Sequence, residues 1–500
     1  MRKNIILSCI LILVLTGCQS GGNAESGSAQ KPNVLLICVD DLRPELNCYG
    51  AGHIVSPNID ALAEESVVFT HAYTQQAVCA PSRNTLMTGL RPDGLGIYDL
   101  QTFFRTKAPN VATMSQYFMQ QGYQAEGMGK IYHTGHGNKN DSLSWSKPHW
   151  YPHQLINQRD PIVSGDTTHL HTSYPKIGGK NIPWVNSGLS EEFHNDPMVT
   201  NHALERLEAL KGEPFFLAVG MVKPHLPFVA PSKYWDLYDP DKIVVPPLDR
   251  PDDYPAYAFT NWGELRKYHG IPAEGPLTDE DAINMIHGYY ACVSLIDAQV
   301  GRLTDKLKEL GLYENTIIVF WGDHGWKLGE YGDWCKHTNY ELDTRIPIIV
   351  RIPQIKAGEG WQSDALVETV DIYPTLCDLA GLELPGHLQG SSFRKVLESK
   401  SAEWDRVAFS QYPRTATIDG QRIPVMGYSM RTPEYRITRW VSRETRETID
   451  TEIYDHRASA PEMVNLAARA ENQQLLERLN KELDEHYAKE HAIGFLEFKE

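Results

Sequence analysis

Four apolar stretches of the chain are each followed by charged or titratable side chains. The stretches cover residues 33–39, 123–128, 215–219 and 316–321. A short continuous apolar run is typical of a strand that is buried on both faces of a parallel sheet. Because ligands bind at the carboxyl ends of the strands in open α/β sheets, we expect one shared site there. The side chains that follow the strands are Asp40, Asp41, Lys130, His133, Lys223, His225, Asp323 and His324.

Helical patterns lie between these stretches. Residues 198–210 are amphipathic and stop at Gly212, and Thr278 begins a sequence resembling a capping box that opens a helix running to about residue 310. Strands that alternate with helices predict an α/β sandwich with a large mixed, mostly parallel sheet. Residues 134–195 have no clear periodicity. A loop region of that length is usually functional, so we expect it to wall a pocket.

The pattern changes near residue 400, where short stretches typical of strands replace the longer elements. We expect a smaller antiparallel sheet followed by a polar terminal helix at about 471–487. This divides the chain into a catalytic domain, 31–400, and a C-terminal subdomain, 401–500. The subdomain carries arginines that either lean over the site or are ordinary surface charges, and the second interpretation is favoured. They are Arg414, Arg431, Arg436 and Arg439, and the strand-like stretches are 406–411, 425–430, 435–441 and 451–454.

The chain begins with the pattern of an exported lipoprotein. Arg2 and Lys3 precede an apolar stretch that ends in Leu-Thr-Gly-Cys at Cys18. The stretch is well below the roughly 20 residues that span a bilayer, which favours a signal peptide over a transmembrane anchor. We expect residues 1–17 to be removed, Cys18 to be lipidated and residues 18–30 to be a flexible tether. The protein would then be periplasmic or anchored to the outer membrane, held by its lipid alone.

The charge balance narrows the class of partner. The chain has 47 Lys and Arg against 64 Asp and Glu, which gives a formal net charge of −17. An acidic surface argues against nucleic acid as a generic partner, and it requires a local basic pocket for any anionic ligand. It also disfavours lengthwise binding of long anionic chains, so we expect action on short fragments or chain ends.

The segment around Cys79 is the most informative in the chain. The sequence CAPSR begins at Cys79 and is followed by a Thr-Gly pair at 88–89. Pro81 and Ser82 suit the first turn of a helix, which places Cys79 just before a helix N-terminus, where free N–H groups and the dipole favour an anion. The segment resembles the C-x-P-S-R signature of type I sulfatases. In that family a maturation enzyme oxidises the cysteine to formylglycine, whose hydrated aldehyde is the nucleophile.

The resemblance extends from about Asn33 past Trp440. Segments similar to iduronate-2-sulfatase and its bacterial relatives include NVLLICVDDLRPELNCYG, QQAVCAPSR, FFLAVGMVKPHLPF, DHGWKLGEYGDW, SQYPR and MGYSMRT. The resemblance implies the α/β sandwich of the alkaline phosphatase superfamily. It implies calcium ligands at Asp40, Asp41, Asp323, His324 and formylglycine 79, and sulfate-binding or proton-transfer positions at Arg83, Lys130, His133, His225 and Lys336.

The residue types themselves fit these roles. Carboxylate oxygens from Asp40, Asp41 and Asp323 suit a hard cation such as Ca²⁺. His324 departs from the Asp-Asn pair of most type I sulfatases, and its softer nitrogen slightly favours Zn²⁺ or Mn²⁺. Trp326 is a candidate for stacking on a sugar face or for packing in the core.

Hydrolysis of a sulfate ester needs fixed positive charge around the transferred group. Arg83, Lys130, Lys336 and the metal would supply it. Either His225 or Lys336 would protonate the departing oxygen, and His133 would accept the proton whose removal releases sulfate. The sequence leaves the choice between His225 and Lys336 open.

We therefore expect an exported sulfatase that acts on a sulfated oligosaccharide. The resemblance favours the 2-O-sulfate of a terminal uronic acid, in heparan or dermatan fragments or in ulvan. One alternative is a phosphomonoester or phosphonate hydrolase of the same superfamily, although phosphatases usually assemble two zinc ions and one cluster of ligands is evident here. The other is a glycan-binding lipoprotein in which Cys79 stays a thiol.

Overall fold

A seven-stranded sheet forms the centre of the protein, in a computed structural model that describes residues 31–152, 176–457 and 462–491. β12 runs antiparallel to both of its neighbours, and the other neighbouring strands run parallel. This mixed, mostly parallel sheet confirms the expected fold class. In spatial order the strands are β13 (Trp361–Glu368), β2 (Val67–Tyr73), β12 (Ile348–Arg351), β9 (Thr316–Gly322), β1 (Asn33–Val39), β7 (Phe215–Met221) and β3 (Gln124–Gly129).

The four strands expected from the apolar stretches are β1, β3, β7 and β9, and they are consecutive in the sheet. Their register is level, with Val39 beside both Met221 and Gly322. Their carboxyl ends therefore lie side by side along one edge, as the sequence predicted. The strands β2, β12 and β13 were not foreseen, since β12 has only four residues and the first half of β13 alternates polar and half-buried positions.

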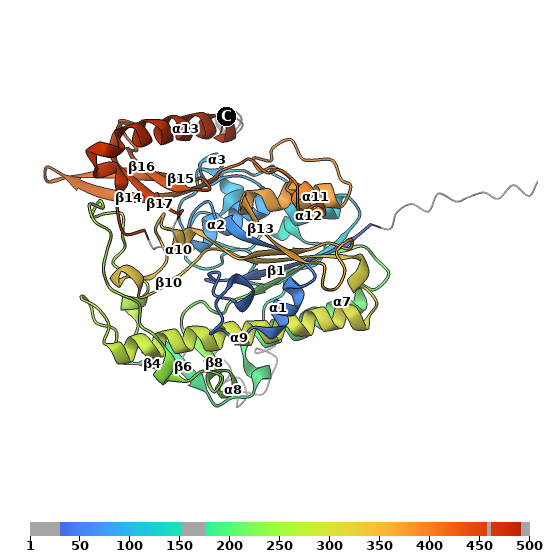
Figure 1. Cartoon of the computed structure of the whole chain (residues 1–500). Coiled ribbons are helices and arrows are strands. Elements are labelled where there is room, and N and C mark those ends of the chain that lie inside the picture. Colours follow the sequence, from blue (N-terminus) through green and yellow to red (C-terminus); the bar gives the residue numbers. More distant parts are fainter. Residues whose placement is uncertain (1–30, 153–175, 458–461, 492–500) are drawn as a thin grey trace, which may run out of the picture. The chain divides into compact units, whose positions relative to one another are not determined.

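Helices cover both faces of the sheet and enclose a separate hydrophobic core on each side (Figure 1). Leu35, Ile37 and Val39 of β1 point into one core, and Val34 and Leu36 point into the other. Burying a side chain of this size contributes about 2 kcal/mol. The first face carries α1 (Pro57–Ala63), α7 (Asn195–Ala209) and α9 (Asp279–Glu309), and the second carries α2 (Cys79–Thr88), α4 (Met114–Gln120), α11 (Ile372–Leu379) and α12 (Arg394–Glu398).

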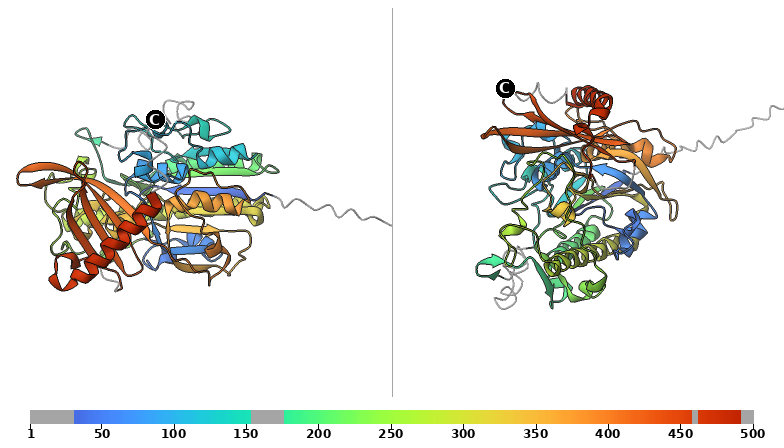
Figure 2. Two further views of the ribbon diagram at one scale, coloured as in Figure 1. Left: turned by 90° about the horizontal axis from the view of Figure 1, so that it is seen from above. Right: turned by 60° about the vertical axis from the view of Figure 1, so that its left-hand side comes forward.

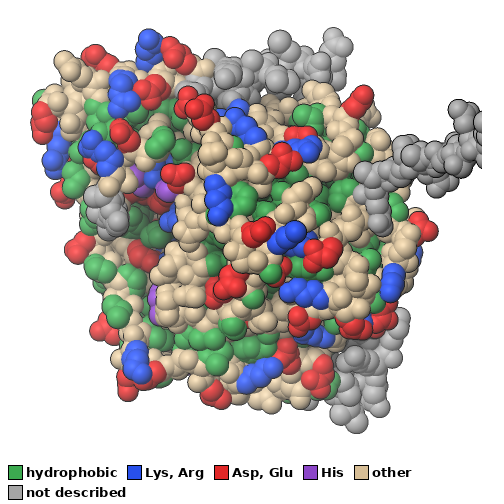
Figure 3. All heavy atoms as spheres, turned by 45° about the vertical axis from the view of Figure 1, so that its right-hand side comes forward, with side chains coloured by type: hydrophobic (Ala, Val, Ile, Leu, Met, Phe, Trp, Pro, Cys, Tyr) green, Lys and Arg blue, Asp and Glu red, His purple; other side chains and the backbone are tan. Residues whose placement is uncertain are grey.

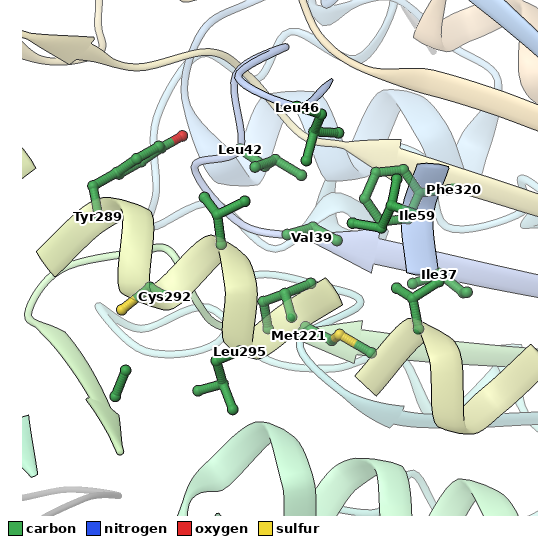
Figure 4. Close-up of a cluster of buried hydrophobic side chains, with 14 of the residues drawn as sticks. Ile37, Val39, Leu42, Leu46, Ile59, Met221, Tyr289, Cys292, Leu295 and Phe320 are labelled. Atoms are coloured by element: carbon green, nitrogen blue, oxygen red, sulfur yellow. The ribbon is translucent and has the colours of Figure 1, made fainter. Parts of the chain in front are cut away.

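The long helix α9 supports the strand ends that carry the acidic residues. Its capping residue is Thr278, whose hydroxyl accepts the Asp281 N–H at 3.1 Å, as the capping pattern predicted. Tyr289, Cys292 and Leu295 of this helix belong to the same hydrophobic cluster as Val39 and Met221 (Figure 4). The core on this face thus reaches the last residues of β1 and β7.

The C-terminal region is a four-stranded antiparallel sheet with a terminal helix, as expected. The helix α13 (Gln473–His491) packs on the sheet through Leu479 and Leu483, which contact Phe409, Met430 and Ile437 (Figure 2). The expected domain boundary near residue 400 falls between α12 and β14. The division into two domains stays a prediction, since residues 32–500 group as one compact unit. The strands are β14 (Ala408–Ile418), β15 (Gln421–Arg431), β16 (Tyr435–Ser442) and β17 (Thr448–Asp455).

Several expectations concern segments outside the described residues. The signal peptide, Cys18 and the tether lie in residues 1–30, and residues 153–175 of the aperiodic region are also outside. Within the described part of the chain, no helix has the length and apolar character needed to cross a bilayer. The remaining short elements are α3 (Pro92–Leu95), β4 (Lys176–Ile177), β5 (Lys180–Asn181), β6 (Trp184–Ser187), β8 (Phe228–Pro231), α8 (Ser232–Trp235), β10 (Lys327–Leu328), β11 (Trp334–Cys335) and α10 (Glu341–Thr344).

Candidate active site

The structure brings the expected site residues together at one edge of the sheet. Asp40 and Asp41 follow β1, Asp323 and His324 follow β9, and Cys79 is the first residue of α2. One ligand atom from each of Asp40, Cys79, Asp323 and His324 lies within 4.8 Å of the others. The sequence analysis expected Cys79 just before the helix, whereas the helix begins at Cys79 itself. Its position still aims the side chain from the N-terminal end of α2 into the site.

The two acidic pairs are locked to each other by hydrogen bonds. The Asp323 N–H donates to the carbonyl oxygen of Val39 at 3.1 Å, and the Asp41 N–H donates to Oδ1 of Asp323 at 3.0 Å. Asp41 has a φ of 60°, in the left-handed region that is costly for a residue with a Cβ. The hydroxyl of Tyr289 holds this conformation by donating to the Asp41 carbonyl at 2.9 Å. The core on the α9 side therefore determines where the Asp41 carboxylate points.

Arg83 is fully buried and ties the acidic residues to the neighbouring strand. Its Nε donates to Asp323 at 2.8 Å and its Nη2 donates to Asp40 at 3.1 Å. Its Nη1 donates to the backbone carbonyls of Lys130 and Ile131. These bonds engage every nitrogen of the guanidinium. The positive charge of Arg83 thus acts on the site through the carboxylates that it orients.

Two lysines bring positive charge to the same place. Lys130 forms an ion pair with Asp40, and Lys336 Nζ lies 2.8 Å from Oδ1 of Asp41. Although burial opposes ionisation of Asp40, Lys130 and Arg83 outweigh it and hold the pKa of that carboxyl well below its usual range. Both ammonium groups are therefore positioned to bind an anion at the edge of the carboxylate cluster.

The thiol of Cys79 lies 3.3 Å from Nε2 of His324. Nδ1 of His324 is 3.0 Å from the carbonyl of Gly325, so the ring donates there and presents the lone pair of Nε2 to the site. Burial lowers the pKa of His324 to about 4, which keeps the imidazole neutral at pH 7. A neutral imidazole nitrogen is a competent metal ligand.

The residues present fit a hard divalent cation. Asp41 Oδ2 is buried and has no hydrogen-bond partner among the described residues. Burial raises the pKa of Asp41 to about 7 despite the nearby Lys336, and it raises the pKa of Asp323 to about 7 despite Arg83. A cation that prefers oxygen ligands would bind Asp41 Oδ2 and would offset the electrostatic repulsion between these closely spaced carboxylates. Asp40, Asp41, Asp323 and His324 would hold it.

Two histidines face the cluster from other strand ends. Nδ1 of His133 is buried and has no hydrogen-bond partner among the described residues, and its Nε2 lies 3.3 Å from Nδ1 of His136. His225 follows β7, and the Lys223 ammonium holds its loop by donating to the carbonyls of His225 and Pro227 at 2.8 and 2.7 Å. Burial lowers the pKa values of His133 and His225 to about 3. His133 is therefore neutral at pH 7, and its Nδ1 has no partner in the part of the chain that the structure describes.

Trp326 decides one of the open alternatives. Its side chain is fully buried, where it packs edge-on against Phe228 with ring centroids 6.2 Å apart. The Lys336 ammonium lies 4.9 Å from its ring centroid. Stacking on a sugar is wrong for this residue, since no face of the ring is open. Trp326 is a core residue that supports Lys336.

Of the four C-terminal arginines, one borders the site, one pairs near the surface and two are buried in ion pairs. Arg436 is buried in ion pairs with Glu341 and Glu462, and Arg431 also contacts Glu341. Arg439 alone pairs near the surface, with Asp484. Arg414 donates to the backbone carbonyls of Tyr257 and His337, next to Lys336. Most of these charges therefore hold the C-terminal sheet in place, and Arg414 alone borders the site.

Sequence reasoning missed Glu264, which contacts two of the expected site residues. Its carboxylate lies 3.2 Å from Lys336 Nζ and 3.3 Å from Nε2 of His225. Glu264 lies in a loop with no periodicity and no motif, so a single acidic residue there gave no signal. Among the described residues of the aperiodic region, His136 contacts the expected site residue His133.

Comparison with known proteins agrees with this geometry. Residues 32–382 match the sulfatase family, and residues 329–489 match the C-terminal region of N-sulphoglucosamine sulphohydrolase. The chain is 35% identical over 500 residues to iduronate 2-sulfatase from Homo sapiens, which covers 87% of this chain and 89% of that protein. It is 31% identical over 420 residues to a sulfatase from Formosa agariphila, with 78% of each chain covered.

Solved structures share the fold at lower identity. The phosphonate monoester hydrolase from Silicibacter pomeroyi superposes with a TM-score of 0.75 at 23% identity, over 92% of this chain and 96% of that chain. A 2-O GAG sulfatase superposes with a TM-score of 0.65 at 22% identity, over 92% and 93% of the two chains. At these identities the likeness shows the architecture alone.

The family match spans most of the chain, and the residues that a sulfatase requires occupy one buried site. Sulfatases have a metal site and a formylglycine derived from cysteine, and in this chain the corresponding cluster is Asp40, Cys79, Asp323 and His324. The chain belongs to the sulfatase family of the alkaline phosphatase superfamily and is a sulfuric ester hydrolase.

Proposed function

We propose that this sulfatase removes the 2-O-sulfate of a terminal uronic acid from a sulfated oligosaccharide. The observation that carries the proposal is the 35% identity to iduronate 2-sulfatases over most of both chains. The Asp323-His324 pair, with His324 Nε2 3.4 Å from Asp41, supports the same branch of the family. A protein named ulvan-active sulfatase, from Formosa agariphila, is 25% identical over 92% of the chain, so uronic acids of ulvan are included in the proposal.

The chain's own residues account for binding of the ester. Lys130 and Lys336 would contact the sulfate oxygens, since their ammonium groups flank the carboxylates at the cluster's edge. Arg83 would keep Asp40 and Asp323 in position. When present, the calcium ion would supply fixed positive charge and the hydrated formylglycine a hydroxyl nucleophile.

Two proton transfers of the reaction can be assigned to side chains near the carboxylate cluster. His133 would accept a proton at Nδ1, the buried nitrogen without a partner among the described residues. Either Lys336 or His225 would donate the proton to the departing sugar oxygen, since both lie beside Asp41, at 2.8 and 4.0 Å. The local basic groups would thus recognise an anion inside a protein whose net charge is −17 and whose acidic and basic side chains are interspersed on the face in Figure 3.

The substrate is tested by measuring inorganic sulfate released from defined disaccharides. We expect release from 2-sulfated uronosyl disaccharides and faster release per sulfate from short fragments than from intact polymer. Release only from 6-O-sulfated hexosamine would refute the uronate assignment. Sulfate and phosphate esters of one aryl alcohol, compared directly, test the phosphonate or phosphate hydrolase alternative, which predicts faster turnover of the phosphate ester.

The cofactors and maturation are further parts of the proposal. We propose Ca²⁺ at Asp40, Asp41, Asp323 and His324, and formylglycine at position 79, made by a maturation enzyme of the host. Mass spectrometry of the peptide spanning Cys79, from the native host, would reveal an aldehyde in place of the thiol. An unmodified thiol in that material would instead support the glycan-binding alternative.

Export is proposed from the sequence of the first 18 residues. We propose that the signal peptide is cleaved before Cys18 and that the lipidated protein is periplasmic or attached to the outer membrane. Labelling of the protein by a radioactive fatty acid, lost in Cys18→Ala, would support this. Equal labelling of the variant would contradict it.

A further inference from the structure

The carboxylate of Glu264 bridges the two groups that compete for the role of leaving-group acid. It lies 3.2 Å from Lys336 Nζ through one oxygen and 3.3 Å from Nε2 of His225 through the other. These two side chains come from different parts of the chain, after β11 and after β7. Among the described residues, two carboxylates have ion-pair contacts to both Lys336 and His225, and they are Asp41 and Glu264.

The loop that carries Glu264 is firmly anchored. Trp262 and Leu265, on either side of it, are 3% and 0% exposed and belong to the core on the α9 side. The guanidinium of Arg266 stacks on the Trp262 ring at 3.4 Å from its centroid and donates to the carbonyl of Pro272 at 2.7 Å. Two buried anchors within four residues fix the backbone, so Glu264 is presented from a rigid turn.

A carboxylate at this place has an electrostatic cost. It stands beside the lysine that would bind an anionic ester, and like charges this close repel each other. The benefit of Glu264 lies in the contacts of its carboxylate. Without Glu264, the ion-pair partner of Lys336 would be Asp41, on the side of the metal-binding cluster. Glu264 gives the ammonium a second partner at 3.2 Å, on the side of His225, which lies 3.3 Å from Glu264 and 4.0 Å from Asp41. It thereby fixes both candidate donors at one point.

We propose that Glu264 is a positioning residue that orients the proton donor for the departing alcohol. The ester S–O bond breaks, the donor gives its proton to the alcohol oxygen, and Glu264 keeps that donor directed at the oxygen. The role applies whichever of Lys336 or His225 donates. The inference rests on the sulfate ester hydrolysis described above, and it is independent of which sugar carries the ester.

The test compares esters whose leaving groups differ in their need for a proton. A sugar alkoxide requires protonation as it leaves, whereas 4-nitrophenolate leaves without it. For Glu264→Gln in the matured, calcium-loaded protein, we expect kcat on a sulfated sugar to fall about 10- to 100-fold, and kcat on 4-nitrophenyl sulfate to fall less than about threefold. Glu264→Asp, which keeps the charge, should restore part of the loss.

A second readout does not involve turnover. Removal of the negative charge should strengthen binding of inorganic sulfate about fivefold, measured by calorimetry, because a like charge near the anion is lost. Glu274→Gln, on the exposed part of the same loop, is the matched control and should change neither quantity. Weaker sulfate binding in Glu264→Gln, or a loss on the sugar ester no larger than on the aryl ester, would overturn the proposal.

These arms separate the proposal from the substrate assignment. Failure of the wild-type protein on 2-sulfated uronosides would refute the proposed substrate, while aryl sulfate turnover and sulfate binding would still report on Glu264. If Glu264→Gln fails to fold, Glu264→Asp decides the question. Because its side chain is shorter, this variant should lose less kcat than Glu264→Gln, and it should lose more kcat on the sugar ester than on the aryl ester. A larger loss on the aryl ester would overturn the proposal.

Discussion

Two buried clusters of charged residues in this protein have similar composition and different consequences. The active-site cluster consists of the carboxylates of Asp40, Asp41 and Asp323 with the cations of Arg83, Lys130 and Lys336. The second, which we call the interlock cluster, consists of Glu341, Glu462, His456, Arg431 and Arg436. Each includes or adjoins a group of possible metal ligands within 4.8 Å of one another: Asp40, Cys79, Asp323 and His324 at the active site, and Glu341, His456 and Glu462 in the interlock cluster.

The two clusters differ in whether their carboxylate oxygens are satisfied. In the interlock cluster, Glu341 accepts from Tyr73 and Arg436 at 2.8 and 2.6 Å. Glu462 contacts Arg436 and His456 through one oxygen and accepts the Glu341 N–H at 2.8 Å through the other. In the active-site cluster, Asp41 Oδ2 has no hydrogen-bond partner among the described residues. A satisfied cluster joins two sheets, whereas an unsatisfied one is prepared for a ligand.

The largest expected effect is on turnover, from Cys79→Ala. Loss of the nucleophile should lower sulfate release by about 1,000-fold or more, because the remaining groups can only bind the ester. The free energy of unfolding should change by less than about 1 kcal/mol, because the side chain of Cys79 contributes little to the packing of the fold. Sulfate release and the urea midpoint measure the two quantities. Cys292→Ala, at a buried thiol of α9, is the control and should keep its turnover per folded molecule.

Arg436→Met should have the opposite signature. Removing the guanidinium leaves the buried Glu462 without an arginine and Glu341 with Arg431 alone, and it should destabilise the protein by about 3 kcal/mol in urea unfolding. Turnover per folded molecule should stay near that of the wild type. Arg439→Met removes the ion pair with Asp484, which is 63% exposed, and should cost less than about 1 kcal/mol. Equal costs for the two variants would contradict a structural role for the interlock cluster.

Calcium should distinguish the two clusters directly. At 100 times its dissociation constant, bound calcium stabilises the folded state by about 2.7 kcal/mol. We expect thermal unfolding to move upward with calcium and back with a chelator in the wild type. The shift should disappear in Asp41→Asn and persist in Glu462→Gln, although the second variant unfolds at a lower temperature throughout. A shift lost in Glu462→Gln instead would place the ion in the interlock cluster.

The smallest expected effect is a pH dependence of the interlock cluster. Although burial opposes ionisation, Arg436 and Arg431 hold the pKa of Glu341 well below its usual range. A carboxyl with a lowered folded-state pKa stabilises the protein above the unfolded-state pKa, near 4.3, and this stability is lost as the pH falls below it. Wild type should therefore lose about 1 kcal/mol more than Glu341→Gln between pH 6 and pH 3.5. Parallel urea midpoints for the two proteins over this range would refute the assignment.

Much of the active site could be predicted because its residues follow recognisable local patterns. Asp40, Asp41, Asp323 and His324 come directly after apolar strands, and Cys79 lies in a signature at a helix start. Local sequence determines strand ends and helix starts, and a parallel sheet then brings those ends together. The four predicted strands are indeed consecutive in the sheet.

The C-terminal region was predicted in outline and misjudged in detail. Short stretches typical of strands, followed by a polar helical pattern, correctly predicted an antiparallel sheet with a terminal helix. The same patterns made Arg431 and Arg436 look like surface charges, although they are 3% and 1% exposed. Their partner Glu341 is about ninety residues away in the sequence, so only the packing of the two sheets could reveal the pairs.

The sequence by itself determined the fold class, the nucleophile position and the set of carboxylates and cations that a sulfatase needs, because each is written in a short stretch of chain. The burial of Trp326, the burial of Arg431 and Arg436, and the contacts of Glu264 were decided by the tertiary structure alone. The physical reason is that each depends on what long-range packing places beside the residue. Glu264 is 72 residues from Lys336 in the chain and 3.2 Å from its ammonium in the fold.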